Sequence, residues 1–286
     1  MTRGRATALG FGAVLLWALL AALTVGTGAV PPFQLLAVCF AIGGAIGLVW
    51  IAAAGRGLGV LRGQPPAVWA VGIGGLFGYH FFYFTALRLA PPAEASLIAY
   101  LWPLLIVLLS GLLPGERLGP GHLLGAAAAF LGAGLIVAGP GAAFDPAAAP
   151  GYAAAGACAL IWSGYSLLSR RLGAAPTETV AVFCLATAAL ALLAHLALER
   201  TVWPEGAAGW AAMAALGLGP VGLAFYLWDV GVKRGDIQIL GVASYAAPLV
   251  STLVLIALGM ARPSPVLVIA AGLIAGGALV AARAGR

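Results

Sequence analysis

Long apolar stretches, separated by short clusters of proline, glycine and charged residues, occupy the chain from end to end. A helix needs about 20 apolar residues to cross a hydrocarbon core of roughly 30 Å. In lipid, a helix also satisfies its backbone N–H and C=O groups within one segment. The pattern therefore predicts an all-α integral membrane protein with ten transmembrane helices, at residues 8–27, 33–54, 66–88, 92–112, 121–138, 150–171, 177–197, 208–232, 238–259 and 264–284.

The composition agrees with a membrane protein. Of the 286 residues, 63% are hydrophobic and only 8% are charged, whereas soluble domains carry about 25% charged residues. Ten spans with short loops use nearly the whole length. We therefore expect the lipid bilayer to be the main surroundings of the chain and no separate soluble domain.

The basic residues predict the orientation. With a cytoplasmic N-terminus, eleven of the 14 Lys and Arg residues fall in loops or ends on the cytoplasmic side and three on the other. The three are Arg88, Arg200 and Arg262. Cytoplasmic loops carry an excess of Lys and Arg. The bias predicts a multi-pass protein of the bacterial inner membrane with both termini in the cytoplasm.

The two halves of the chain resemble each other when the second is shifted by 145 residues. The shift aligns the pairs Trp17/Trp162, Pro31/Pro176, Cys39/Cys184, Tyr100/Tyr245, Pro103/Pro248, Arg117/Arg262 and Pro120/Pro265. One ungapped register for such uncommon residues indicates a duplication of residues 1–145 in residues 146–286. Five spans is an odd number, so the second repeat is expected to be inverted. In carriers built this way, the substrate site lies between the repeats near the bilayer midplane.

Several motifs carry a resemblance to a known family. They are Ala86-Leu87, Tyr100-Leu101-Trp102-Pro103-Leu104 and Leu113-Pro114-Gly115-Glu116, with Gly231-Val232 and Tyr245-Ala246-Ala247-Pro248-Leu249 in the second half. The chain resembles the EamA-type, ten-helix branch of the drug/metabolite transporter (DMT) superfamily, and within it the YddG-like exporters of aromatic amino acids. The resemblance implies alternating access by rocking helix bundles and export of metabolites into the periplasm. The second half departs from it, because Ala261 stands at the position of Glu116. We therefore expect Glu116 to have a structural use at the end of the fourth span.

Polar aromatic side chains inside the spans are the main candidates for a substrate site. Tyr79 and Tyr83 share one face of the third span, with His80 beside them. Interfacial belts explain aromatic residues near span ends but fit deeper ones such as Trp17 and Trp162 poorly. Hydroxyl and indole groups in lipid need partners, which favours a cavity over plain helix packing, and aromatic walls suit flat apolar substrates. The predicted substrate-binding residues are Trp17, Tyr79, His80, Tyr83, Ser96, Tyr100, Trp102, Trp162, Tyr165, Tyr226, Ser244 and Ser251.

Some of these residues also have a structural interpretation. His80 is the histidine well inside a span, and either lines the cavity or packs with a hydrogen bond. Ser96, Ser244 and Ser251 could bind a substrate or only a carbonyl four residues earlier.

Four further residues are candidates for gating or for an ion pair. Asp229 and Lys233 lie four residues apart inside the eighth span, so an intramembrane ion pair is expected, with substrate contact or coupling as the alternative. Pro103 and Pro248 interrupt the fourth and ninth spans at equivalent places. Because proline bends helices, these spans are candidate gates.

Other classes of protein fit the residues less well. An intramembrane enzyme needs a nucleophile, a base and an acid at membrane depth, and the spans offer only Asp229 and His80 as strongly ionisable groups. A pump would need a nucleotide site, and a channel would need rings of charge or a repeated filter sequence. We expect no catalytic residue, cofactor, metal or nucleic acid, and a monomer is compatible with the sequence. The prediction is a secondary transporter that exports aromatic and related hydrophobic amino acids; the alternative is a carrier of another small metabolite or a drug-like amine.

Overall fold

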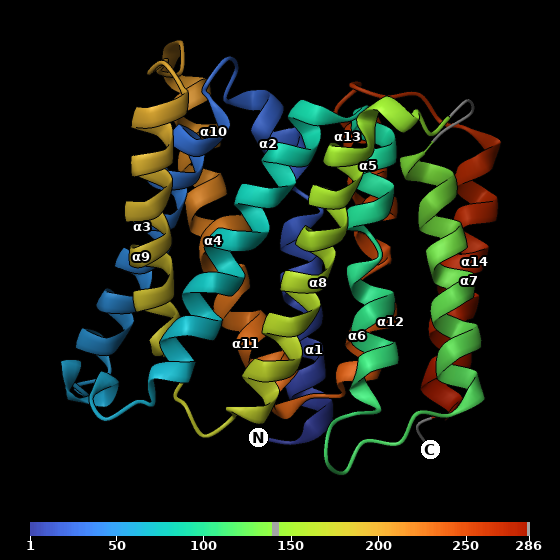
Figure 1. Ribbon diagram of the computed structural model, residues 1–286, viewed down its shortest axis with the longest axis horizontal. Helices are drawn as coiled ribbons and strands as arrows, with labels where there is room; N and C mark the ends of the chain where they lie inside the picture. Colours follow the sequence, from blue (N-terminus) through green and yellow to red (C-terminus); the bar gives the residue numbers. More distant parts are fainter. Residues whose placement is uncertain (139–142, 285–286) are drawn as a thin grey trace.

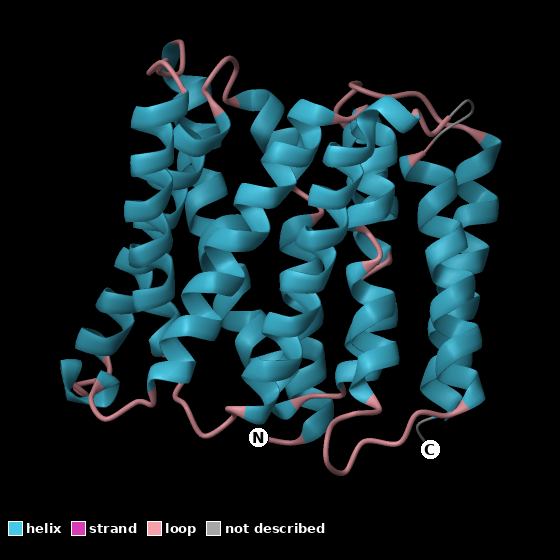
Figure 2. Ribbon diagram, in the orientation of Figure 1, coloured by secondary structure: helices cyan, strands magenta, loops and turns pink. Residues whose placement is uncertain are grey.

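A computed structural model describes residues 1–138 and 143–284 as a single bundle of helices (Figure 2), with no strand in these ranges. The α-helices are α1 (Arg3–Trp17), α2 (Leu20–Gly26), α3 (Pro32–Ala53), α4 (Pro66–Leu89), α5 (Pro92–Ala99), α6 (Trp102–Ser110), α7 (Pro120–Val137), α8 (Ala149–Arg171), α9 (Thr179–Leu198), α10 (Gly206–Leu218), α11 (Ala224–Arg234), α12 (Ile237–Ala243), α13 (Ala246–Ala257) and α14 (Pro265–Ala284). Shorter turns are η1 (Leu58–Leu61), η2 (Pro146–Ala148) and η3 (Gly219–Leu223), of which η3 is π-helical.

Nine segments of the described chain are long and apolar enough to cross a membrane. They account for every predicted span except the sixth, which corresponds to α8. This helix has 23 residues, but tyrosines, serines and a tryptophan lower its mean hydropathy. In Figure 1, α8 stands among the other spans at the centre of the bundle. The all-helical membrane fold is therefore confirmed, whereas the count of ten spans stays a prediction.

Several predicted spans are interrupted in the middle. The fourth span breaks at Tyr100–Leu101 between α5 and α6, and the ninth at Ser244–Tyr245 between α12 and α13. Pro103 and Pro248 lie just after these breaks, in the first turn of α6 and of α13. A proline is tolerated there because the first turn leaves its N–H groups without helical partners.

The break in the fourth span is filled by a side chain of the ninth. Leu104 N–H donates to the Tyr245 hydroxyl at 3.0 Å, and that hydroxyl donates to the Tyr100 carbonyl at 3.2 Å. In an unbroken helix, Leu104 N–H would bond directly to the Tyr100 carbonyl four residues earlier. The Tyr245 hydroxyl is thus inserted into the backbone ladder, and the two interrupted spans are joined where they break.

The helices pack in four main pairs, α3 with α9, α7 with α14, α4 with α8 and α1 with α11. The α3–α9 pair lies at one edge of the bundle and the α7–α14 pair at the other, with α1, α4 and α8 between them (Figure 1). Helices α1 and α11 approach closely at Gly10 and Gly231, where a Cβ on Gly10 would lie 2.9 Å from the Gly231 Cα. Such contacts let backbones meet in membranes, where close packing drives helix association.

One end of the bundle, where α1 begins and α14 ends, carries an ionic cluster formed by Arg3, Glu116, Arg170 and Asp236 (Figure 1 shows this end at the bottom). Arg3 pairs with Glu116 at 3.2 Å and with Asp236 at 3.0 Å, and Arg170 also pairs with Glu116. Arg170 donates to the backbone carbonyls of Val232 and Gly235 as well. Glu116, which the sequence singled out, therefore joins helix ends from both halves of the chain.

The opposite end is organised by the buried carboxylate of Glu199. It accepts bonds at 3.1 Å from the N–H groups of Phe33 and Gln34 at the start of α3. Arg88 lies 2.9 Å and the His195 ring nitrogen 3.0 Å from the same carboxylate. A carboxylate at a helix N-terminus satisfies free N–H groups and complements the helix dipole. Glu199 thus ties α9 to the start of α3 and to the end of α4.

Candidate functional site

Five aromatic side chains from four helices meet in the middle of the bundle, and we call them the central aromatic cluster. They are Trp17 of α1, Trp102 of α6, Trp162 of α8, and Phe225 and Trp228 of α11. The Trp17 ring centroid lies 5.1 Å from that of Trp228, 5.6 Å from Trp162 and 6.3 Å from Trp102. These separations are typical of edge-to-face and offset aromatic contacts. The structure therefore brings together three predicted tryptophans that are far apart in the sequence.

Helix α4 adds the polar aromatic face that the sequence predicts. Tyr79 and Tyr83 stack with ring centroids 6.0 Å apart, and Tyr79 lies 5.2 Å from Trp162 of the central aromatic cluster. The Tyr83 hydroxyl is 3.2 Å from the Ser96 hydroxyl of α5. Ser96 thus joins the same group of side chains through Tyr83.

His80 connects α4 to the other side of the cluster. Its Nδ1 donates to the Leu76 carbonyl at 2.7 Å, which leaves Nε2 as the acceptor in a neutral ring. The ring lies 5.2 Å from Phe40 of α3 and 6.2 Å from Phe225. The sequence did not single out Phe40 and Phe225, because a phenylalanine in an apolar span carries no polar group that distinguishes it from lipid-facing neighbours.

The central aromatic cluster and the polar aromatic side chains beside it together have a buried part and an accessible part. Trp102, Trp162 and Trp228 are buried, with Trp228 at 0% exposure. Part of the surface stays accessible on five residues, which are Trp17, Tyr79, His80, Tyr83 and Tyr100. This accessible part offers ring faces, hydroxyls and one imidazole acceptor. Ring faces stack on flat apolar groups and attract ammonium groups.

Tyr226 and Ser244, two other predicted residues, lie apart from the cluster. The Tyr226 hydroxyl donates to the Gly43 carbonyl of α3 at 2.8 Å. Tyr226 precedes Trp228 by two residues, so the two side chains leave α11 on different faces. The Ser244 hydroxyl donates to the Leu240 carbonyl at 2.7 Å, which is the structural alternative left open by the sequence.

Ser251 and Tyr165 complete the predicted set. Ser251 lies on α13, beyond the break at Ser244–Tyr245, so it does not share a continuous helix face with Ser244. Tyr165 does belong beside the cluster, since its buried ring lies 5.1 Å from Trp162.

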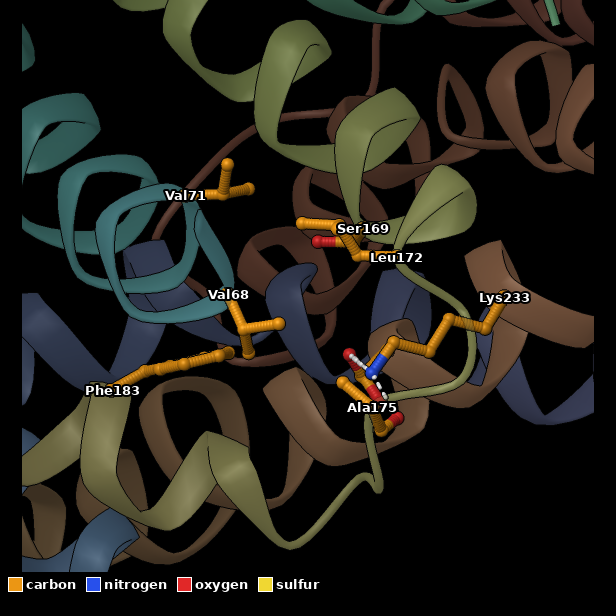
Figure 3. A pocket seen from close by; sticks show the side chains of 8 residues that line it. Val68, Val71, Ser169, Leu172, Ala175, Phe183 and Lys233 are labelled. Carbon is orange, nitrogen blue, oxygen red and sulfur yellow. Dashed lines mark hydrogen bonds and ion pairs between the residues drawn. The ribbon is translucent and has the colours of Figure 1, made fainter. Parts of the chain in front are cut away.

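Asp229 and Lys233 form a buried ion pair near the end that carries the ionic cluster. Lys233 Nζ lies 2.8 Å from Asp229 Oδ1 and donates to the Ala175 carbonyl at 2.9 Å. The Asp229 side chain is 0% exposed and that of Lys233 is 5% exposed. Figure 3 shows the Lys233 side chain extending toward Ala175 beside a small cavity. The cavity is about 10 Å³, room for one water molecule.

The fold and the site define a multi-pass helical membrane protein whose two halves both contribute to one central aromatic cluster. The chain belongs to the EamA-like transporter family, whose model matches residues 5–138 and again residues 149–283. It is therefore a transporter rather than an enzyme, and a multi-pass protein of the inner membrane. The family resemblance predicted from the sequence is confirmed.

Two relatives extend this assignment. The chain is 59% identical over 283 residues to the aromatic amino acid exporter YddG of Ancylobacter novellus, with 98% of each chain covered. It is also similar to a protein of known crystal structure, with a TM-score of 0.95, 59% identity and full coverage of both chains.

Proposed function

We propose that the chain exports aromatic and related hydrophobic amino acids across the bacterial inner membrane by alternating access. The observation that carries this proposal is the central aromatic cluster, with the accessible face of α4 beside it. The name of the 59%-identical exporter supports the same class of substrate. Ring faces suit the recognition of a flat apolar side chain by a small-molecule carrier, and the central aromatic cluster offers them.

The accessible residues are the proposed contacts for the substrate. Tyr79 and Tyr83 offer stacked ring faces, and Trp17 closes the site from α1. The free Nε2 of His80 can accept a hydrogen bond from an ammonium group. Trp102 and Trp162 form the buried wall behind them.

The proposed architecture is two inverted five-helix repeats, residues 1–145 and 146–286, which together provide ten spans. The 145-residue shift places α3 on α9, α7 on α14, α1 on α8 and α4 on α11. The α3–α9 and α7–α14 pairs then map onto themselves, while the α4–α8 pair maps onto α11–α1. The two separate matches to the family model support the same division.

A cytoplasmic location is proposed for both termini. The first residues of α1 and the last of α14 lie at the same end of the bundle (Figure 1), and this end holds most of the basic residues. The positive-inside rule places such an end in the cytoplasm.

The interrupted spans are the proposed moving parts. The Tyr245 hydroxyl, from the break in the ninth span, bridges the break before Pro103 in the fourth span, so a change in one span reaches the other directly. The Asp229–Lys233 pair is proposed to hold α11 to the segment after α8 during these motions.

The test is uptake of labelled tryptophan, phenylalanine and lysine into liposomes that contain the purified protein, with and without a pH gradient. We expect saturable uptake of the two aromatic amino acids and little uptake of lysine. Tyr83→Ala and His80→Ala should each reduce aromatic uptake by about tenfold or more, the effect of losing one good contact. Tyr152→Ala is the matched control, because Tyr152 packs against Phe144 at the end of the bundle away from the site.

Each outcome has a distinct meaning. Equal losses in Tyr152→Ala and Tyr83→Ala would contradict the site assignment. Insensitivity to the pH gradient would indicate facilitated diffusion. Uptake of a labelled drug-like amine without uptake of any amino acid would replace the proposed substrate class with amines.

A further inference from the structure

Two neighbouring spans are interrupted at the same depth and are joined there by one side chain. The first span breaks after Trp17, where α1 ends, and α2 begins at Leu20. The eighth span passes through the π-helical turn η3 between α10 and α11. The indole N–H of Trp17 donates to the Pro220 carbonyl in this turn at 3.1 Å.

The Pro220 carbonyl is available because of the local helix geometry. Ala224 N–H donates to the Gly219 carbonyl five residues earlier, which is the π-helical bond, rather than to Pro220 four residues earlier. Pro220 itself is buried. A buried carbonyl needs a donor, because leaving it unpaired carries the full desolvation penalty. Trp17 supplies that donor from 203 residues away in the sequence.

The repeat counterparts of these residues lack the same arrangement. The 145-residue shift relates Trp17 to Trp162 and Pro220 to Gly75. Both counterparts lie inside helices that run without interruption, α8 and α4. Within residues 1–138 and 143–284, the Trp162 indole N–H has no backbone acceptor of this kind. Trp162 is therefore an internal control, with the same side chain and contacts to the same cluster residues Trp102, Phe225 and Trp228.

We propose that Trp17 is a positioning residue that couples substrate binding to the conformation of the eighth span. This inference rests on the proposed function. The Trp17 ring contacts Trp228 and Trp162 at 5.1 and 5.6 Å, so an aromatic substrate entering the cluster must displace it. Displacement withdraws the Trp17 indole N–H from the Pro220 carbonyl. This carbonyl then regains a hydrogen-bond donor only if the backbone hydrogen bonds of η3 change. Binding is thereby linked to a rearrangement of η3. The substrate interacts differently with the two conformations of the turn, which is the condition for a ligand to shift the equilibrium between them.

The experiment compares Trp17→Phe with Trp162→Phe in liposomes, by the rate and concentration dependence of labelled phenylalanine uptake. Trp17→Phe keeps an aromatic ring but removes the donor. We expect its maximum rate to fall about tenfold while KM changes by less than about twofold. Trp162→Phe also keeps an aromatic ring and removes no donor to η3, so its maximum rate should change by less than about twofold. Equal effects of the two substitutions, or a change confined to KM in Trp17→Phe, would overturn the proposal.

A second variant keeps the test decisive if Trp17→Phe does not fold. Pro220→Ala restores an amide N–H to the turn and favours regular α-helical bonding of the 220 carbonyl. We expect it to lower the maximum rate as Trp17→Phe does, and the double variant to be no slower than either single variant. Additive losses would contradict coupling through this hydrogen bond. Absence of any amino-acid uptake by the unchanged protein would refute the proposed function and not this link. Hydrogen exchange of a peptide that covers η3, with and without phenylalanine, still tests the link: no difference between Trp17→Phe and the unchanged protein would overturn it.

Discussion

The Asp229–Lys233 pair is the buried ion pair within the eighth span. Its carboxylate is fully buried and its ammonium group nearly so. Removing one member of such a pair leaves an uncompensated buried charge, which costs about 3–5 kcal/mol. We predict that Asp229→Asn lowers the midpoint of thermal unfolding in detergent by several degrees.

The double variant Asp229→Asn with Lys233→Met separates charge from packing. It removes both charges, so we expect it to recover most of the lost stability. Asp145→Asn, at an exposed position, is the matched control and should change the free energy of unfolding by less than about 0.5 kcal/mol. If the double variant is as unstable as Asp229→Asn alone, the loss of stability does not come from the unpaired charge on Lys233.

At the same scale, the sequence predicted the polar members of the site and missed the apolar ones. Tyr79, His80 and Trp162 stand out because such residues are uncommon inside a span, and all three join one group of rings. Phe40 and Phe225 complete that group but cannot be told from ordinary apolar residues. The sequence also does not show which face of α11 points to the cluster. The packing of α11 places Trp228 in the cluster and directs Tyr226 toward α3.

Among the elements, the breaks in the spans are supported by side chains from other spans. Tyr245→Phe removes the hydroxyl that lies between Leu104 N–H and the Tyr100 carbonyl. These groups then lose their partner, at a cost of about 1–3 kcal/mol. We predict lower thermal stability and faster hydrogen exchange of a peptide that covers residues 100–104.

The control for this prediction is Tyr152→Phe, which removes a hydroxyl that accepts from Asp145 N–H near the exposed end of the bundle. Water replaces that partner, so we expect little change. Unaltered exchange of residues 100–104 in Tyr245→Phe would mean that the break does not depend on the inserted hydroxyl.

The sequence predicted these elements well where a residue type marks the change. Prolines begin α3, α4, α5, α7 and α14. Pro103 and Pro248, which the repeat aligns with each other, mark the interruptions of the fourth and ninth spans. The break after Trp17 was not predicted, because the residues around it are leucines and alanines that favour a continuous helix. Its cause is tertiary, since the π-helical turn of the eighth span lies against it.

Across the whole molecule, the two ends of the bundle differ in how they join the halves. Arg3 and Glu116 of the first half pair with Asp236 and Arg170 of the second. The counterparts of this ionic cluster at the opposite end, taken with the 145-residue shift, are all uncharged: Ala148, Ala261, Pro91 and Val25. Duplication alone would make the ends alike, so the ionic cluster is an addition to the repeat. The opposite end joins the halves through a different pair, Arg88 with the buried carboxylate of Glu199.

This asymmetry predicts that weakening the ionic cluster opens its end of the bundle. Glu116→Gln removes the charge that Arg3 and Arg170 share. A partly exposed ion pair contributes about 0.6 kcal/mol, which shifts an opening equilibrium about threefold. We expect Val232→Cys, in a background without the three native cysteines, to react about threefold faster with a thiol reagent when Glu116→Gln is present.

Salt at about 1 M should produce the same increase by screening the ionic cluster. The control is Glu205→Gln, at an exposed position at the other end, which should leave the reactivity unchanged. Equal reactivity in all these conditions would mean that the ionic cluster does not hold this end closed.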